Sequence, residues 1–363
     1  MNIDLLKRLC ETPGIPGREE RVRELIIKEV KGLFDEIHTD PMGSLICRRG
    51  PRSARTSRSK KTTRRRSSSG NPTKVMLPCH MDEIGFYVKA IDDKGFVRIQ
   101  PAGGFDPRNL FSRRVLVCTK SGDYVGCMNP GGRPIHISSP EERSKVPEVK
   151  EFFVDLGRAP ADVKRKVRVG DMIVWHEPFE EIGDKVVSKA LDNRVACWLG
   201  IEVARALEKS GVAHACELYC VFTVQEEVGL RGARTAAAAI QPDIAIGLDT
   251  TLACDTPGVP SEETVTRHGD GAVLHLMDSS LISDYRLIED LEAVAKKKRI
   301  KVQRSILPRG GQDGGAVQQA MGGCRAAGLT VGTRYIHSVT ESIDKRDMDA
   351  ALKLLTAWVP TVK

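Results

Sequence analysis

The sequence predicts an α/β protein in which a mixed-sheet α/β/α domain carries an inserted small β-barrel. The chain has 363 residues, which is enough for two or three domains at about 150 residues each. Helix and strand patterns alternate in the flanking parts of the chain, whereas the part between them consists of short β-like runs separated by Gly and Pro. We therefore expect one domain built from residues 1–83 and 178–363, and a β-rich domain from residues 84–177.

The first part of the chain contains one predicted helix and several predicted strands. Apolar residues such as Val22, Ile26 and Val30 recur at helical spacing within residues 18–34, which predicts an amphipathic helix. Extended runs follow at 36–39, 44–47 and 74–79.

A strongly basic tract at residues 51–73 separates two of these predicted strands. It contains eight Lys and Arg residues and no acid, and outside it the 48 Asp and Glu residues balance the remaining Lys and Arg, so the net charge of +8 belongs to this tract. The tract has almost nothing to bury, so we expect a disordered, solvated loop inserted at a turn. The alternative is a basic arm that binds nucleic acid weakly by releasing counterions.

The second part of the chain alternates between helix and strand, as expected for an α/β domain. Helices are predicted at 194–209, 231–239 and 283–297, and strands at 218–224, 243–248 and 329–335.

The cysteines and the hydropathy of the sequence indicate the cellular compartment of the protein. The ten cysteines are scattered without a Cys-x-x-Cys pair, which favours reduced thiols in a cytoplasmic protein. Asp4, Lys7 and Arg8 interrupt the region where a secretory signal needs an apolar core, and no apolar run reaches about 18 residues. We therefore expect neither export nor a membrane-spanning segment.

Histidines and carboxylates gather at the ends of the predicted strands and helices. Open α/β sheets place their sites at the carboxyl ends of the strands. Imidazole and carboxylate are ligands that Zn²⁺ and similar divalent ions take, and the acids exceed the needs of one tetrahedral ion, which favours two ions that share a carboxylate. The residues at these positions are His80, Asp82, Asp192, Glu226, Glu227, Asp249 and His337.

Each of these residues also has a simpler interpretation. A single His or Asp at a strand end is usually a cap or a turn former. The adjacent Glu226 and Glu227 repel each other unless a cation is near, but they would also suit a solvated helix start. Cys79, beside His80, is either a competing soft ligand or a buried inert thiol.

Six motifs, in order, resemble the M42 family of metallo-aminopeptidases, the tetrahedral (TET) and glutamyl aminopeptidase group. They span most of the chain: HMDEIGFYV (80–88), KALDNR (189–194), FTVQEEVGLRGA (222–233), AIGLDT (245–250), GGQDGGA (310–316) and RYIHS (334–338). The resemblance implies a zinc-peptidase catalytic domain and a PDZ-like dimerisation domain in the β-rich insert. It also implies dimers that assemble into a dodecamer.

The resemblance also implies a role for each site residue. His80, Asp192 and Asp249 would hold one metal ion, and Glu227, His337 and the same Asp192 would hold the second. Glu226 would be the general base and Asp82 would orient the His80 imidazole. Zn²⁺ is the expected ion, with Co²⁺ or Mn²⁺ as alternatives, because the ligands suit all three.

The expected activity is the metal-dependent release of N-terminal residues from peptides, with Glu226 as the base that activates a metal-bound water. One alternative is a deacylase that removes an acyl group from an amine at a similar binuclear site. Another is a non-enzymatic nucleic-acid-binding or scaffold protein led by the basic tract, which would be expected to carry a damaged set of metal ligands.

Overall fold

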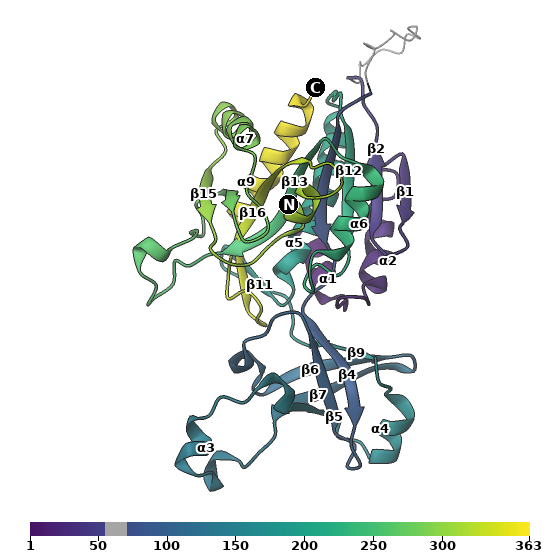
Figure 1. Ribbon diagram of the computed structural model, residues 1–363, viewed down its shortest axis with the longest axis vertical. Helices are drawn as coiled ribbons and strands as arrows, with labels where there is room; N and C mark the ends of the chain where they lie inside the picture. Colours follow the sequence, from purple (N-terminus) through teal and green to yellow (C-terminus); the bar gives the residue numbers. More distant parts are fainter. Residues whose placement is uncertain (55–70) are drawn as a thin grey trace.

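The computed structural model describes residues 1–54 and 71–363, which form a layered α/β part and a small β-barrel (Figure 1). The chain forms the first strands of the large sheet, then the barrel, and then returns to complete the sheet. The predicted combination of an α/β sheet with an inserted β-barrel is confirmed. None of the helices within the described ranges has the length and apolar character needed to cross a bilayer.

The large sheet is mixed, with a parallel centre and antiparallel edges. The four central strands, β12, β3, β13 and β16, run parallel to one another, so their carboxyl ends meet at the same edge. In spatial order the strands are β1 (Glu36–Thr39), β2 (Leu45–Arg49), β12 (Glu217–Thr223), β3 (Lys74–His80), β13 (Ile244–Leu252), β16 (Arg325–Arg334), β17 (Glu341–Asp344), β11 (Lys185–Ser188) and β10 (Glu180–Ile182), and β14 (Ala272–Met277) and β15 (Val302–Ile306) branch from β16.

Helices cover both faces of this sheet. Side chains alternate along a strand, so Leu218 and Cys220 of β12 pack into the larger core, and Tyr219 and Val221 into the core on the opposite face. The larger core is closed by α1 (Ile3–Glu11), α2 (Glu20–Glu29), α5 (Leu191–Ser210), α7 (Tyr285–Lys298) and α9 (Lys345–Trp358). The opposite face is closed by α6 (Arg231–Ile240) and α8 (Asp313–Gln318).

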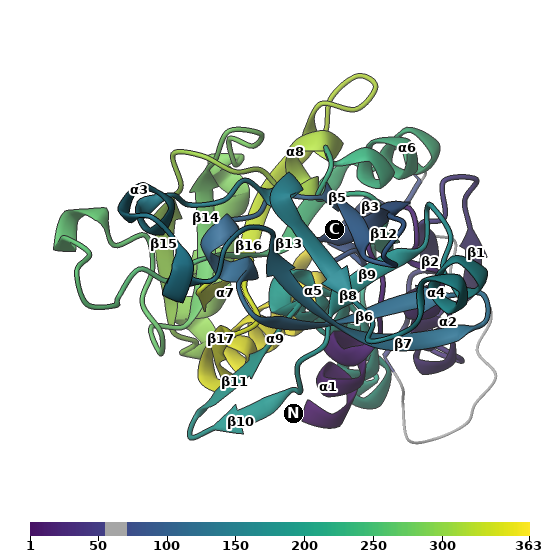
Figure 2. The ribbon, with the colours of Figure 1, turned by 90° about the horizontal axis from the view of Figure 1, so that it is seen from below.

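The barrel closes on its own apolar core, which includes Phe86, Val117 and Phe152. Seen from the barrel end (Figure 2), the β10–β11 hairpin projects from the edge of the large sheet. In the order in which they pair, the barrel strands are β4 (Gly85–Ile91), β5 (Val97–Ala102), β8 (Phe152–Asp155), β7 (Gly122–Pro130), β6 (Arg113–Thr119) and β9 (Met172–Trp175). Two short helices, α3 (Pro140–Ser144) and α4 (Pro160–Lys166), lie between barrel strands in the sequence.

The expectation of a simple turn between β2 and β3 is wrong. β12 lies between these two strands in the sheet, so the connection has to pass the start of β12. Its described part does so, because Arg52 forms an isolated antiparallel bridge with His214, just before β12. The prediction of a solvated loop or basic arm at 51–73 falls largely on residues 55–70, which lie outside the described residues.

Several elements are not among those that the sequence predicts. The helices α1 and α9, the strand β17 and the β14–β15 pair were all absent from the predicted set. The ten cysteines are all unpaired thiols, in agreement with their scattered positions.

Candidate metal centre

His80 ends β3, and the chain leaves the sheet immediately after it. The Nδ1 atom of the buried imidazole lies 3.0 Å from the main-chain oxygen of Asp82 and 3.7 Å from the carboxylate Oδ1 of the same residue. A proton on Nδ1 is therefore donated to the main-chain carbonyl, which leaves the Nε2 lone pair free for a ligand. The main chain of Asp82, rather than its carboxylate, makes the shorter contact with the His80 ring.

The Asp82 carboxylate instead supports the turn that follows β12. Its Oδ1 and Oδ2 accept the main-chain N–H groups of Glu226 and Glu227, both at 3.1 Å. The turn is irregular, since Gln225 has a φ of 56°. The two glutamate side chains are only 10% and 7% exposed, and α6 begins four residues later at Arg231, so a solvated helix start is excluded.

Three further predicted residues come from other elements. Asp192 lies at the start of α5, where its backbone and that of Asn193 depart from helical geometry. Asp249 was expected just after a strand, but β13 continues to Leu252 and Asp249 lies within it. His337 lies in the connection between β16 and β17 and has a φ of 61°.

The predicted ligands converge around the two imidazoles. The His80 Nε2 atom lies 3.3 Å from Asp192, 3.7 Å from Glu226 and 3.8 Å from Asp249. The His337 Nε2 atom lies 3.5 Å from Asp192 and 3.4 Å from Glu227. Asp192 presents Oδ1 to one imidazole and Oδ2 to the other, so it bridges the two halves of the cluster.

Two groups of three side chains have the spacing that a metal ion needs. The ligand atoms of His80, Asp192 and Glu227 lie within 4.8 Å of one another, and so do those of His80, Glu226 and Asp249. These groups differ from the two sets that the family resemblance implies. Glu226 takes the place of Asp192 beside His80 and Asp249, and His80 takes the place of His337 beside Asp192 and Glu227.

The electrostatics of the cluster are unusual for buried groups. Burial raises the pKa of the Glu226 carboxyl well above its usual range, and the nearby Asp249 and Glu227 add to the shift. Burial alone would lower the pKa of His337, but the carboxylates of Glu227 and Asp192 raise it to about 12. The four carboxyl groups outnumber the two imidazoles, and burial raises the pKa of Asp249 as well as that of Glu226, which favours the protonated forms of both acids.

These residues fit a divalent cation. Among the residues that the structure describes, the ion-pair partners of Asp192, Glu226, Glu227 and Asp249 are the two histidines, with no Lys or Arg. Apart from its ion-pair contact with His337, the buried Glu227 Oε1 atom has no hydrogen-bond partner among the described residues. Buried carboxylates of this kind are normally paired or coordinate a metal. Imidazole and carboxylate donors are those that Zn²⁺ prefers in catalytic sites.

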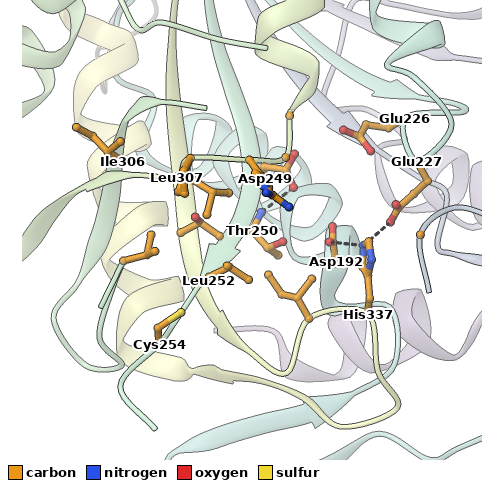
Figure 3. Close-up of a pocket in the computed structure, with 18 of the residues that line it drawn as sticks. Asp192, Glu226, Glu227, Asp249, Thr250, Leu252, Cys254, Ile306, Leu307 and His337 are labelled. Carbon is orange, nitrogen blue, oxygen red and sulfur yellow. Dashed lines mark hydrogen bonds and ion pairs between the residues drawn. The ribbon is translucent and has the colours of Figure 1, made fainter. Parts of the chain in front are cut away.

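The cluster lies in a cavity of about 1090 Å³. Figure 3 shows Glu227, His337 and Asp192 on one side of this cavity, and Leu252, Ile306 and Leu307 on the other. Cys79 does not line the cavity. It is buried, with its Sγ 3.5 Å from the main-chain oxygen of Leu77, and burial raises the pKa of its thiol. This geometry fits the inert-thiol interpretation.

One buried residue of the site was missing from the sequence-based set. Glu341 of β17 is 2% exposed and accepts main-chain N–H groups from both Asp192 and His337. Its position four residues after His337 is the only signal in the sequence, because its other contact is to the main chain of Asp192, which is 149 residues away.

The chain matches one protein family along most of its length. A family model described as M42 glutamyl aminopeptidase matches residues 62–354. The lysyl aminopeptidase of Pyrococcus furiosus is 30% identical over 369 residues, with 99% of this chain and 97% of that protein covered.

Solved aminopeptidase structures are also similar to this chain over almost its whole length. The aminopeptidase of the archaeon Desulfurococcus kamchatkensis is 34% identical, with a TM-score of 0.88 over 99% of this chain and 94% of that one. The Pyrococcus horikoshii TET1 peptidase, described as able to assemble into a tetrahedron or a large octahedral shell, is 28% identical, with a TM-score of 0.84 over 99% of both chains. With a family match over most of its length and relatives that it covers almost end to end, the chain belongs to the M42 glutamyl aminopeptidase family.

Proposed function

We propose that this protein is a binuclear metal-dependent aminopeptidase that releases N-terminal residues from peptides. The observation that carries the proposal is the convergence of two imidazoles and four carboxylates in one cavity, with no Lys or Arg among their described ion-pair partners. Membership of an aminopeptidase family supports the same reaction.

The proposed metal ligands are His80, Asp192, Asp249, Glu227 and His337, with Asp192 shared between two ions. Divalent ions held there, zinc in the first instance, would polarise the attacking water and the scissile carbonyl. The Nε2 atoms of both histidines face carboxylates of this set, which supports their assignment as ligands.

Glu226 is the proposed general base. Its main-chain N–H is held by Asp82, and its carboxylate lies at the cluster beside His80. Its raised pKa, caused first by burial, suits a group that takes a proton from water and then delivers it to the leaving amine. Cleavage is proposed to start at the N-terminus because the chain belongs to an aminopeptidase family.

A homo-oligomer is the proposed assembly, with dimers formed through the barrel and twelve copies in the complete particle. The Pyrococcus horikoshii TET1 peptidase, which covers 99% of this chain, is described as forming a tetrahedron or an octahedral shell. Measuring the mass of the purified protein in solution by light scattering tests this proposal, and a stable monomer would contradict it.

A substrate panel combined with metal analysis tests the activity. We expect about two divalent ions per chain, hydrolysis of aminoacyl-amides and no hydrolysis of N-acylated analogues. The reverse preference would identify a deacylase. Absence of both activities in the fully metal-loaded protein would overturn the proposed function.

A further inference from the structure

Glu341 joins two of the proposed metal ligands through their main chains. Its Oε2 accepts the N–H of Asp192 at 3.0 Å, and its Oε1 accepts the N–H of His337 at 2.8 Å. Both carboxylate oxygens are thus occupied by donors, and the side chain is buried. Glu341 therefore contacts the main chain of the residues that carry the ligands, and among the described residues it belongs to neither group with metal-ligand spacing.

The two segments that Glu341 joins have irregular backbones at these positions. Asp192 precedes the regular part of α5, and His337 has a φ of 61° in the β16–β17 connection. A left-handed backbone at a residue with a side chain persists only when its surroundings hold it. The Glu341 carboxylate supplies such a restraint to both segments at once.

We propose that Glu341 is a positioning residue that fixes the separation of the Asp192 and His337 side chains and thereby sets the affinity of the site for its metal. These side chains lie 3.5 Å apart, from Oδ2 to Nε2. The inference rests on the proposed metal site. Residues that orient ligands in this way typically change metal affinity 10- to 100-fold when they are removed.

The chain contains a matched control for a purely structural effect. Asp347 of α9 is also buried, and its two oxygens accept the main-chain N–H groups of Gly271 and Gly269 at 2.7 and 2.8 Å. It belongs to neither the metal cluster nor the cavity. Glu341→Gln and Asp347→Asn therefore each replace a buried carboxylate that accepts two main-chain N–H groups. The first lies at the site and the second lies away from it.

The experiment titrates Zn²⁺ into the metal-free wild type and both variants against a fluorescent chelator, and measures the melting temperature of each metal-free protein. We expect Glu341→Gln to bind zinc about 10- to 100-fold more weakly and Asp347→Asn to bind like the wild type, although both metal-free variants melt at lower temperature. Unchanged affinity in Glu341→Gln, or equal weakening in both variants, would overturn the positioning role. A wild type that binds no zinc would overturn the metal site itself.

A second, independent observation concerns the side of the cavity that faces the cluster. Leu252 at the end of β13 and Ile306 at the end of β15 are 37% and 58% exposed, and Leu307 lies beside them (Figure 3). The charged residues that line the cavity outside the cluster, Glu262, Glu263 and Arg309, are exposed to solvent. The side of the cavity that faces the cluster is therefore apolar at these three residues, and the remaining charges are hydrated.

We infer that this apolar wall, defined by Leu252, Ile306 and Leu307, binds the side chain of the substrate's N-terminal residue, and that the enzyme prefers large aliphatic or aromatic residues there. This inference deepens the proposed aminopeptidase function and rests on it. A leucine or phenylalanine side chain would remove these exposed apolar groups from water, whereas a carboxylate or an ammonium group would lose hydration against them.

The test compares leucyl, phenylalanyl, alanyl, glutamyl and lysyl amides for the wild type, Ile306→Asp and Ile282→Asp. Ile282 is 66% exposed and does not line the cavity, so it is the matched control. We expect the highest kcat/KM for leucyl or phenylalanyl substrates, about a tenfold loss of leucyl activity in Ile306→Asp, and no such loss in Ile282→Asp. Fastest cleavage of glutamyl or lysyl substrates would overturn the inference and leave the proposed function intact. Hydrolysis of none of the five would overturn the proposed function.

Discussion

The carboxylate of Asp82 holds the main chain of Glu226, because its Oδ1 accepts the Glu226 N–H at 3.1 Å. The adjacent residue, Glu227, donates its own N–H to Oδ2 of the same carboxylate. Meanwhile, the His80 ring is held by the main-chain oxygen of Asp82, which every variant at this position retains. The side chain and the main chain of Asp82 therefore act on different parts of the site.

This division predicts the effect of Asp82→Asn. An amide keeps the size of the carboxylate but presents an N–H to one of the two donors, so the Glu226–Glu227 turn should move while the His80 ring stays in place. We expect kcat to fall by about 10- to 100-fold. Steady-state kinetics on an aminoacyl-amide measures the effect, and an unaltered kcat would contradict the role of the side chain.

Glu226 and Asp192 should respond differently to substitution. Glu226→Gln keeps the size of the side chain and removes the base, so kcat should fall by about 10² to 10⁴ while the metal content survives. Asp192→Ala removes the carboxylate that faces both imidazoles, so metal and activity should be lost together. Metal analysis and kinetics on the same preparations decide the assignment, and equal metal loss in both variants would refute it.

Removal of metal should also lower stability. A ligand that binds only the folded state stabilises it by about 2.7 kcal/mol when its concentration is 100 times the dissociation constant. We therefore expect a chelator to abolish activity and to lower the melting temperature, with both restored by Zn²⁺. Full activity in a preparation shown to be free of metal would contradict the metal-dependent mechanism.

The ion pair between Arg334 and Asp255 predicts a pH dependence of stability. Two contacts of 2.7 Å join the groups, and the Arg334 guanidinium lowers the pKa of Asp255 to about 2. Because the folded-state pKa lies below the unfolded value near 3.9, the pair stabilises the fold above about pH 4, and this stabilisation is lost as the pH falls towards 2.

The corresponding variant is Asp255→Asn. Its free energy of unfolding should be about 2 kcal/mol below that of the wild type at pH 7, and this difference should shrink towards pH 2. Denaturant unfolding of both proteins in chelator separates this effect from metal loss. A difference that does not change with pH would show that the stabilisation is not electrostatic.

A linker that replaces the basic tract has to be long enough to cross β12 in the sheet. β2 and β3 flank β12, so they lie about 10 Å apart, and a two-residue turn cannot join them. A Gly/Ser linker of about six residues in place of 55–70 keeps the bridge between Arg52 and His214 and provides enough chain for the crossing. We expect near-normal metal content and activity, together with loss of any low-salt retention on heparin. A folded but inactive variant would show that the tract contributes to the site or to assembly.

Much of the fold and site could be predicted because both depend on local patterns. His80 ends an apolar strand, Glu226, Glu227 and His337 follow others, and parallel strands bring their carboxyl ends together. Asp249 is a partial exception, since its strand continues past it and its carboxylate is nevertheless in the cluster. The inserted barrel could be predicted because the residue pattern changes from alternating helix and strand patterns to short β-like runs. This change spans the residues that form β4 to β9.

The remaining features depend on contacts between distant segments. Nothing near β2 or β3 in the sequence reveals that β12 pairs between them, because pairing is decided by the whole sheet. Glu341 acts through main-chain N–H groups, which have no side-chain signature. The helix α9 is different, because Met348, Ala351, Leu355 and Trp358 have helical spacing and Asp344 caps its start, so its sequence did contain a readable signal.

The barrel reaches back to the metal centre. Gly104, in the connection between β5 and β6, lines the cavity, and the Asn109 side chain in the same connection donates to the main-chain oxygen of His337 at 3.5 Å. Cutting the barrel out of the chain would therefore open one wall of the cavity and remove the Asn109 contact to His337, whose main-chain N–H would still be held by Glu341. Through Asn109, the barrel, which is the proposed dimer interface, is joined directly to the main chain of a proposed metal ligand.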